Sequence, residues 1–451
     1  MKKYHAIVVL LLAGLLSLAG CKKATHQTAR QYGTPFKHVP DARDATIYEV
    51  NIRAFSKAGN LQGVTARLDS IKALGVNVIY LMPIYPVGKV KSKNSPYCVR
   101  NYRKINKHFG TLADLRTLVR QAHKRNMAVI LDWVANHTSF DNPWTKHKSW
   151  YLRDSTGAIE SPPGMGWNDV AQLNYKNPQM RQAMIKAMKY WVYKANIDGF
   201  RCDYADGPPF SFWKTAIHDL RTQTGHLLLM LAESGNPKLF KAGFNYIFGF
   251  SFYGNLKAIY NKGRSVTSID SLNQKEYRDA ADTQRVVRYL TNHDVNSSDG
   301  TALKIFGGRK GSLAAFVVVA YMKGVPFVYN GQEIGKKYPL KFPFTGKNID
   351  WSAYSNIEQS YKKIIALRNR SEAIRRGKLT SYSNHDVCAF TKTLGSKEVL
   401  VLSNLRNKTV RYALPKTVEN TSWVDAFSQK PVHPGSDITL KPYEYEVYQK
   451  R

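Results

Sequence analysis

Cysteine and acidic residues are both scarce in this chain of 451 residues. It has four cysteines, and 32 aspartates and glutamates stand against 67 lysines and arginines, which gives a formal net charge of +35. Apart from Cys21 near the N-terminus, the cysteines are Cys98, Cys202 and Cys388. Such an odd, widely spaced set argues against a disulfide framework, and no pair has the spacing of zinc ligands. We therefore expect three buried or half-buried thiols and no metal site.

The excess of positive charge is not concentrated anywhere in the sequence. Lysines and arginines are spread along the whole chain, with no arginine-rich arm and no motif of a nucleic-acid-binding fold. This pattern predicts that the protein does not bind nucleic acid. It favours a basic exported protein near an anionic envelope surface, and a polyanionic glycan substrate is the alternative.

Long apolar runs are absent beyond the first 20 residues. Two lysines at the start precede an apolar stretch over residues 6–18, which is too short for a usual membrane span. The stretch ends in Leu-Ala-Gly just before Cys21, which resembles the lipobox of bacterial lipoproteins. We predict a signal peptide over residues 1–20, lipidation of Cys21, a tether over residues 21–43, and a lipid-anchored place in the cell envelope, periplasmic or at the cell surface. The alternative is an ordinary secretion signal with an incidental cysteine.

Short apolar runs and longer helical patterns alternate from residue 46 onward. Alternation of this kind indicates a parallel sheet, and eight candidate strands over this length favour a closed (β/α)8 barrel, which we place at residues 44–372. The expected strands are Thr46–Ile52, Val76–Met82, Met127–Trp133, Asp198–Cys202, Leu227–Leu231, Asn245–Phe248, Val286–Thr291 and Val325–Tyr329. The expected helices include Leu61–Leu74, Thr111–Asn126, Pro178–Ala195, Pro209–Thr224, Gly311–Lys323 and Ile357–Arg370.

Two regions depart from this alternation. Residues 134–175 are too long for a plain loop after the third strand and are rich in tryptophan, so we predict a small inserted subdomain. Residues 377–451 contain four strand-like runs separated by turn residues: Val387–Lys392, Glu398–Asn404, Thr409–Leu414 and Tyr443–Tyr448. They predict a separate antiparallel β domain, a β-sandwich.

Charged residues gather where four of the expected strands end, the place where barrels of this kind carry their chemistry. They are Asp132 on the third strand, Arg201 and Asp203 on the fourth, Glu233 after the fifth, and His293 and Asp294 after the seventh. A neighbouring arginine would lower the pKa of Asp203 and keep it ionised as a nucleophile, whereas a crowded Glu233 would hold its proton as a general acid. Paired carboxylates of this kind cleave glycosidic bonds.

At this point the sequence resembles the α-amylase family of glycoside hydrolases. The matching segments are Asp132-Trp-Val-Ala-Asn-His137, Gly199-Phe-Arg-Cys-Asp203, Ala232-Glu233 and Thr291-Asn-His-Asp294. The resemblance implies that Asp203 is the nucleophile, Glu233 the acid/base and Asp294 the acid that stabilises the transition state. It further implies that Arg201 orients the nucleophile, that His137 and His293 bind sugar hydroxyls, and that Tyr97 stacks on the sugar ring.

The chain also departs from the family pattern. Asp206 and Gly207 replace the lysine–histidine pair that often follows the nucleophile, and Gln172 stands where the inserted subdomain usually has an acid. Of the calcium-associated positions, Asn136 alone matches. We therefore expect the family's calcium site to be absent or altered, and no cofactor to be required.

The expected activity is retaining hydrolysis of α-glucosidic bonds, α-1,4 first of all, in starch-like glucans or maltooligosaccharides. A transglycosylase, or a relative that cleaves α-1,6 bonds or cyclodextrins, would use the same residues. From a different class, a catalytically silent glycan-binding lipoprotein is the remaining alternative, although such proteins usually lack one or more of the three acids. Chain-length preference, endo or exo action and oligomeric state do not follow from the sequence.

Overall fold

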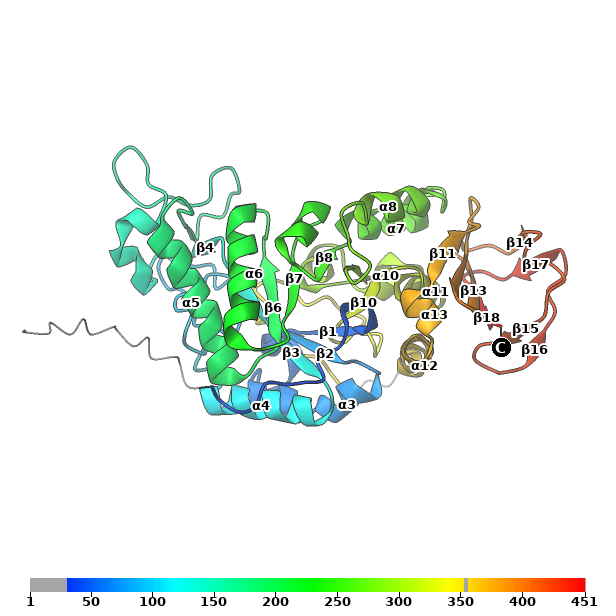
Figure 1. Ribbon diagram of the computed structural model, residues 1–451, viewed down its shortest axis with the longest axis horizontal. Helices are drawn as coiled ribbons and strands as arrows, with labels where there is room; N and C mark the ends of the chain where they lie inside the picture. The colour runs from blue at the N-terminus through cyan, green and yellow to red at the C-terminus, as the bar shows by residue number, and fades with distance from the viewer. Residues whose placement is uncertain (1–30, 353–355, 451) are drawn as a thin grey trace, which may run out of the picture.

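Eight parallel strands form a closed barrel in the computed structural model, which describes residues 31–352 and 356–450 (Figure 1). Around the barrel the order is β1-β10-β9-β8-β7-β6-β3-β2. The strands are β1 (Ile47–Val50), β2 (Val78–Leu81), β3 (Ala128–Val134), β6 (Gly199–Asp203), β7 (Leu229–Ala232), β8 (Tyr246–Phe248), β9 (Arg285–Tyr289) and β10 (Val325–Tyr329). Every residue of these strands is buried, which explains their nearly continuous apolar runs. The predicted (β/α)8 fold is confirmed.

Helices surround this barrel and join its strands. They are α1 (Ile52–Phe55), α2 (Leu61–Thr65), α3 (Leu68–Ala73), α4 (Leu112–Lys124), α5 (Pro178–Ala195), α6 (Phe210–Thr224), α7 (Phe250–Lys262), α8 (Ser268–Glu276), α9 (His293–Ser298), α10 (Ala302–Ile305), α11 (Gly308–Tyr321), α12 (Ile357–Arg370) and α13 (Glu372–Arg376). Short 3-10 turns lie at η1 (Ala42–Asp44) and at η4 (Pro237–Ala242), which joins β7 to β8.

The single helix expected over residues 61–74 is wrong, because α2 and α3 are separate. The backbone leaves the helical region at Arg67, where φ is −108° and ψ is 10°. The Arg67 guanidinium lies 4.1 Å from the centre of the Trp351 ring, so the break coincides with a contact to a distant part of the chain. By contrast, the helix expected from Thr111 is a single helix, and it begins with a capping box: Thr111 Oγ1 accepts from the Asp114 amide, and Asp114 Oδ2 accepts from the Thr111 amide.

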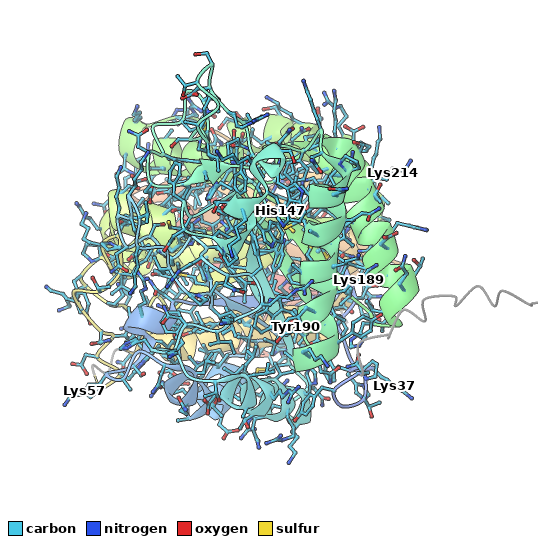
Figure 2. The ribbon with its side chains drawn as sticks, turned by 90° about the vertical axis from the view of Figure 1, so that its left-hand side faces the viewer. Lys37, Lys57, His147, Lys189, Tyr190 and Lys214 are labelled. Carbon is cyan, nitrogen blue, oxygen red and sulfur yellow. The ribbon has the colours of Figure 1, made fainter. Side chains whose placement is uncertain are left out.

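The insertion after β3 is built from little regular structure. β4 (His137–Thr138) and β5 (Ala171–Gln172) form a two-stranded antiparallel ribbon, and the 3-10 turns η2 (Pro143–Lys146) and η3 (Lys148–Trp150) lie between them in sequence. In Figure 1 the loops of this region project from one end of the molecule. Figure 2 shows that face, on which the labelled Lys37, Lys57 and Lys214 all project outward, in keeping with positive charge that is spread rather than clustered.

The C-terminal region folds as two antiparallel sheets. One has the order β11-β12-β13-β18-β15-β16 and the other consists of β14 and β17. Their strands are β11 (Lys378–Ser381), β12 (Val387–Leu394), β13 (Lys397–Asn404), β14 (Val410–Ala413), β15 (Trp423–Asp425), β16 (Pro431–Val432), β17 (Asp437–Leu440) and β18 (Tyr445–Gln449). The expected antiparallel β domain is confirmed, although the sequence patterns missed β11, β15, β16 and β17.

The larger C-terminal sheet is buried on both faces. Val387 and Ala389 on β12 pack into a core shared with β14 and β17, whereas Cys388 and Phe390 join the core of the barrel. Since successive side chains on a strand point to opposite faces, the sheet is sandwiched between the small sheet and the barrel. Figure 1 shows it at the side of the barrel, next to α11 and α13.

The part of the expected tether that the structure describes is not free chain. The Tyr32 amide donates to the Tyr193 carbonyl at 2.7 Å, and the Phe36 ring stacks on His123 with centroids 4.2 Å apart. Residues 31–43 therefore belong to the folded domain. The predicted signal peptide and Cys21 lie outside the described residues. In the ranges that the structure covers, no helix combines the length and apolarity that crossing a membrane would require.

Candidate active site

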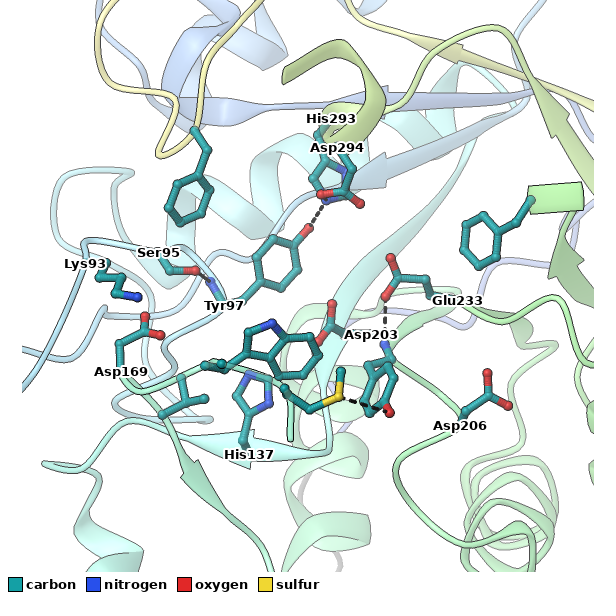
Figure 3. Close-up of a pocket in the computed structure, with 17 residues that line it drawn as sticks. Lys93, Ser95, Tyr97, His137, Asp169, Asp203, Asp206, Glu233, His293 and Asp294 are labelled. Atoms are coloured by element: carbon teal, nitrogen blue, oxygen red, sulfur yellow. Dashed lines mark hydrogen bonds and ion pairs between the residues drawn. The ribbon is translucent and has the colours of Figure 1, made fainter. Parts of the chain in front are cut away.

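The expected catalytic residues meet at one mouth of the barrel (Figure 3). β3 and β6 run side by side with Asp132 opposite Arg201 and Val134 opposite Asp203, so these charges lie at neighbouring strand ends. A cavity of about 550 Å³ opens there. Its lining includes six of the seven residues proposed for catalysis and substrate binding: Tyr97, His137, Asp203, Glu233, His293 and Asp294. The seventh, Arg201, lies beneath them.

Arg201 is the centre of the site's charge network. Its Nη1 lies 2.8 Å from Asp132 Oδ1 and 2.9 Å from Asp203 Oδ1. Its Nη2 lies 2.6 Å from Glu233 Oε1. Because the arginine side chain is only 1% exposed, these contacts are made away from water, where charge-assisted hydrogen bonds are strong. One guanidinium thus fixes both carboxylates that the sequence assigns to catalysis.

The pKa values of this pair differ from the sequence expectation for Asp203. Burial and the charge of Glu233 raise the pKa of the Asp203 carboxyl well above its ordinary value, although Arg201 acts in the opposite direction. Burial also raises the pKa of Glu233, with Arg201 opposing. The expectation that the arginine would lower the pKa of Asp203 is therefore wrong. Burial raises this pKa more than the guanidinium, which is shared among three carboxyls, lowers it. Retaining chemistry requires one acid and one carboxylate side by side, and Asp203 and Glu233 are the two carboxyl groups that Arg201 brings together here.

His293 is held by a residue that the sequence patterns did not single out. Its Nδ1 lies 2.6 Å from Glu49 Oε1, and its backbone amide donates to Glu49 Oε2 at 3.2 Å. On the other side of the ring, Nε2 lies 2.7 Å from the Tyr97 hydroxyl. Burial alone would lower the pKa of His293, but the carboxylates of Asp294 and Glu49 raise it to about 9. Glu49 is fully buried in β1, and an acid inside an apolar strand was the available signal.

The remaining polar groups line the cavity with different exposures. The Asp294 side chain is 58% exposed and stands at the mouth, 3.3 Å from His293 Nε2. The Tyr97 hydroxyl donates to Asp132 Oδ2 at 3.0 Å, so its ring is held in a fixed orientation. Burial lowers the pKa of His137 to about 4, which leaves a neutral imidazole at neutral pH. Cys202, between Arg201 and Asp203 on β6, is fully buried, and the alternation along the strand turns it away from the mouth toward the surrounding helices.

Apolar side chains complete the rim of the cavity. Trp167 from the insertion packs edge-on against Tyr204, with centroids 5.2 Å apart, and Tyr204 follows the nucleophile position directly. Phe250 and Phe342 are 38% and 47% exposed although both line the cavity. Large exposed rings around a polar floor suit sugar rings, whose faces are apolar and whose edges carry hydroxyls. No sequence pattern singled out Phe250 or Phe342.

The three positions tied to calcium by the family resemblance lie together beside this cavity. Gln172 Nε2 donates to Asn136 Oδ1 at 3.2 Å, to the Asn136 carbonyl at 3.0 Å and to the Leu173 carbonyl at 3.1 Å. Gly207 lies so close that a side chain there would meet Asn136 Oδ1 at 2.2 Å. Oxygens that a cation would need already accept hydrogen bonds from an amide, so these residues do not fit a calcium ion. Nor do the described residues contain a cluster of three or more metal-ligating side chains.

Two family models match this chain. One, described as the alpha amylase catalytic domain, covers residues 32–157 and 165–208. The other, described as the maltogenic amylase C-terminal domain, covers residues 378–447. The first match includes Asp132, Arg201 and Asp203, and the second spans most of the C-terminal sheets.

Individual proteins extend this similarity along the chain. Alpha-amylase 3 of Dictyoglomus thermophilum is 25% identical over 81% of this chain and 85% of its own length. Oligo-1,6-glucosidase of Parageobacillus thermoglucosidasius is 22% identical over 91% of this chain and 99% of its own. Among solved structures, an alpha-amylase from Lactobacillus plantarum superimposes with a TM-score of 0.82 and 26% identity, covering 91% of this chain and 100% of that one. The names of these relatives include different linkage specificities.

Proposed function

We propose that this chain is a glycoside hydrolase of the α-amylase family and that it hydrolyses α-1,4-glucosidic bonds in starch-like glucans or maltooligosaccharides with retention of configuration; the similarity to the family models and to the amylase relatives supports this. The observation that carries this proposal is the bridging of Asp203 and Glu233 by one buried guanidinium at the floor of a ring-lined cavity. Retaining glycosidases hold their two carboxyls only about 5–5.5 Å apart, and a shared arginine favours such closeness.

The reaction follows from these positions in two steps. A carboxylate oxygen of Asp203 attacks the anomeric carbon while the bond to the leaving oxygen breaks and Glu233 gives that oxygen its proton. Glu233 then takes a proton from water, whose oxygen attacks the same carbon and releases Asp203. Asp294, His137 and His293 are placed to bind hydroxyls of the sugar, and Tyr97 to stack on its ring.

Two alternatives use the same residues. A transglycosylase would deliver the sugar from Asp203 to another sugar instead of to water. Cleavage of α-1,6 bonds is supported by the name of the oligo-1,6-glucosidase relative, and cleavage of cyclodextrins by the name of a cyclomaltodextrinase relative. A silent glycan-binding lipoprotein has less support, since all three acids line the cavity.

Sugar release from a substrate panel tests the proposal. We expect reducing sugar from soluble starch and maltooligosaccharides, and a fall of about 10³-fold or more in kcat/KM for Asp203→Asn and for Glu233→Gln. Asp219→Asn is the matched control, because this acid lies on α6 and pairs with Lys189 away from the cavity. Pullulan and cyclodextrins as preferred substrates would replace the α-1,4 proposal. No sugar from any α-glucan, or full activity of Glu233→Gln, would contradict the mechanism.

The stereochemical outcome is measured separately. Proton NMR of the first products, recorded before mutarotation, should show the α-anomer. A β-anomer would mean direct attack by water and would exclude Asp203 as nucleophile.

Two further proposals concern the metal and the membrane. The protein needs no calcium, because the Gln172 amide occupies the hydrogen-bonding position that a cation would need. The protein is anchored in the cell envelope through lipid on Cys21, as the sequence before that residue suggests. Labelling with a radioactive fatty acid, with Cys21→Ala as the comparison, tests the anchor: equal labelling of both chains would exclude it.

A further inference from the structure

A second, larger cavity lies at the opposite end of the barrel from the active site. Its volume is about 820 Å³, within the range of small-molecule sites. It is enclosed by α8, by Arg285 at the beginning of β9, by Lys323 just before β10, and by β11 and β12 of the C-terminal sheet. The catalytic residues follow the other ends of the barrel strands. The second cavity therefore shares no residue with the site proposed for hydrolysis.

Basic side chains dominate this second cavity, which we call the interface cavity. Five of the residues that line it are basic: Arg285, Lys323, Arg376, Lys378 and Lys392. Only two acids line it, Asp270 and Asp282. Asp282 is 77% exposed and is shared between Arg43 at 2.9 Å and Arg285 at 3.9 Å, and Arg376 is paired with Asp44. Among the described residues, the lining cations left without a carboxylate partner are Lys323, Lys378 and Lys392.

Lys392 is the residue that most clearly indicates an anionic ligand for the interface cavity. It lies on β12 two residues after Phe390, so it points to the face of the sheet that meets the barrel. The residue is only 2% exposed, and across the described ranges its ammonium makes no hydrogen bond and no ion pair, so the interface cavity that it lines is what its Nζ faces. A buried unpaired charge is costly, by several kcal/mol in typical proteins, unless a partner binds or the proton leaves.

The neighbours of Lys392 increase this cost. Burial first of all, together with the nearby charges of Arg285, Lys323, Arg368 and Arg288, lowers its pKa to about 7. Lys323 has no acidic partner in the described structure either, and its Nζ lies 4.2 Å from the centre of the Tyr277 ring. Burial raises the pKa of Asp270, the other acid that lines the cavity.

We propose that the interface cavity binds the phosphate group of a small phosphorylated molecule, with Lys392 and Lys323 as its principal ligands. A phosphate dianion carries two charges and several acceptor oxygens, so it can satisfy both lysines and Arg285 at once. The volume of the interface cavity leaves room for a sugar-sized group beside the phosphate. Such a ligand would also tie the barrel to the C-terminal sheet, since Lys323 belongs to one and Lys392 to the other.

Calorimetric titration of the intact protein tests this site. The probes are inorganic phosphate, glucose 6-phosphate and, as the uncharged comparison, glucose, all in about 0.15 M NaCl so that the general positive charge of the surface is screened. We expect phosphate or glucose 6-phosphate to bind and glucose not to bind. Tighter binding of the sugar phosphate would identify the source as a phosphorylated sugar, and equal binding would identify the free anion.

Variants locate the binding. Lys392→Met keeps the length and apolar stem of the side chain and should weaken phosphate binding about tenfold or more, as expected for losing one hydrogen bond to a charged group. Lys323→Met leaves the buried lysine in place and should also weaken binding. Lys262→Met, at the exposed end of α7, is the control and should bind as the unmodified protein does. Absence of binding, or equal binding by Lys392→Met and the control, would overturn the proposal.

Proton uptake gives an independent reading of Lys392. Binding an anion should return the missing proton to the ammonium, so titration with sulfate at pH 8 should consume up to one proton, measured in buffers of different ionisation enthalpy. Sulfate is chosen because it does not titrate there. The other charged or titratable groups around Lys392 are Asp270, Tyr277, Asp282, Arg285, Arg288, Lys323, Arg368, Arg376 and Lys378. Equal uptake by Lys392→Met would assign the proton to another of these groups and contradict the role of Lys392.

Discussion

The two ends of the barrel differ in how their buried cations are paired. At the catalytic mouth, Arg201 is surrounded by the carboxylates of Asp132, Asp203 and Glu233, all within 2.9 Å. At the interface cavity, Lys392 is as deeply buried but faces other cations. The first arrangement is complete within the protein, and the second needs an external partner. A buried charge that the fold leaves unpaired is therefore more informative about ligands than one that it pairs.

The largest effect should come from removing the cation at the catalytic mouth. Arg201→Met leaves three buried carboxylates without their partner, and breaking a buried ion pair typically costs about 3–5 kcal/mol. We expect the free energy of unfolding, measured by urea denaturation, to fall by about that amount, with loss of hydrolysis. A loss below about 1 kcal/mol would mean that water already screens this network, and the contrast between the two ends would fail.

Removing the cation at the interface cavity should have the opposite sign. Lys392→Met replaces an unpaired charge by an apolar side chain of similar length, so we expect a gain in the free energy of unfolding of about 1–2 kcal/mol in phosphate-free buffer. Hydrolysis of maltooligosaccharides should be unchanged. Urea denaturation with Lys262→Met as the control measures this gain, and a loss of stability would show that Lys392 has a partner within the fold.

Rising pH should also act on the two ends in opposite directions. His293 has a pKa of about 9 against 6.5 when unfolded, so its contribution to stability is complete below pH 6.5 and is lost as pH rises through 9. Lys392 has a pKa of about 7 against 10.5, so the unfolded chain binds the additional proton and the destabilising effect of this lysine shrinks between pH 7 and 10.5.

Stability curves of two variants separate these contributions. The unmodified protein should have a higher free energy of unfolding than His293→Gln at pH 6.5, and this difference should shrink as pH rises to 9. The unmodified protein should have a lower free energy of unfolding than Lys392→Met at pH 7, and this difference should shrink as pH rises to 10. Parallel curves for a variant and the unmodified protein would show that the residue concerned does not titrate in this interval.

The smallest effect should come from a chelator. Since Gln172 Nε2 donates to three oxygens beside the catalytic mouth, we expect EDTA to change neither Tm nor activity measurably. Gln172→Glu would replace that donor by a carboxylate next to Asn136. Its Tm should fall, and added calcium should restore part of the loss. A large fall in Tm of the unmodified protein with EDTA would show that this end also depends on an external ion.

The sequence predicted the site best where chemically reactive residue types stand at the ends of segments with strand periodicity. Asp132, Arg201 and Asp203 occupy strand ends, and their type and order predicted one convergent site. Glu49 was missed because it lies in the middle of β1, and nothing in the pattern linked it to His293, 244 residues away. The break at Arg67 and the short strands of the C-terminal region were missed for a related reason: their conformation depends on contacts with distant parts of the chain.

The sequence by itself determined the barrel, its C-terminal β domain and the residues at the strand ends, because these follow from local hydrophobic periodicity and from motif order. Only the tertiary structure decided the ionisation of those residues and the character of the interface cavity. Burial raises the pKa of Asp203 despite the adjacent Arg201, and β12 carries Lys392 against a barrel that is distant in sequence. How far a group is removed from water, and which charges from distant parts of the chain lie near it, both depend on the packed fold. Local sequence does not encode them.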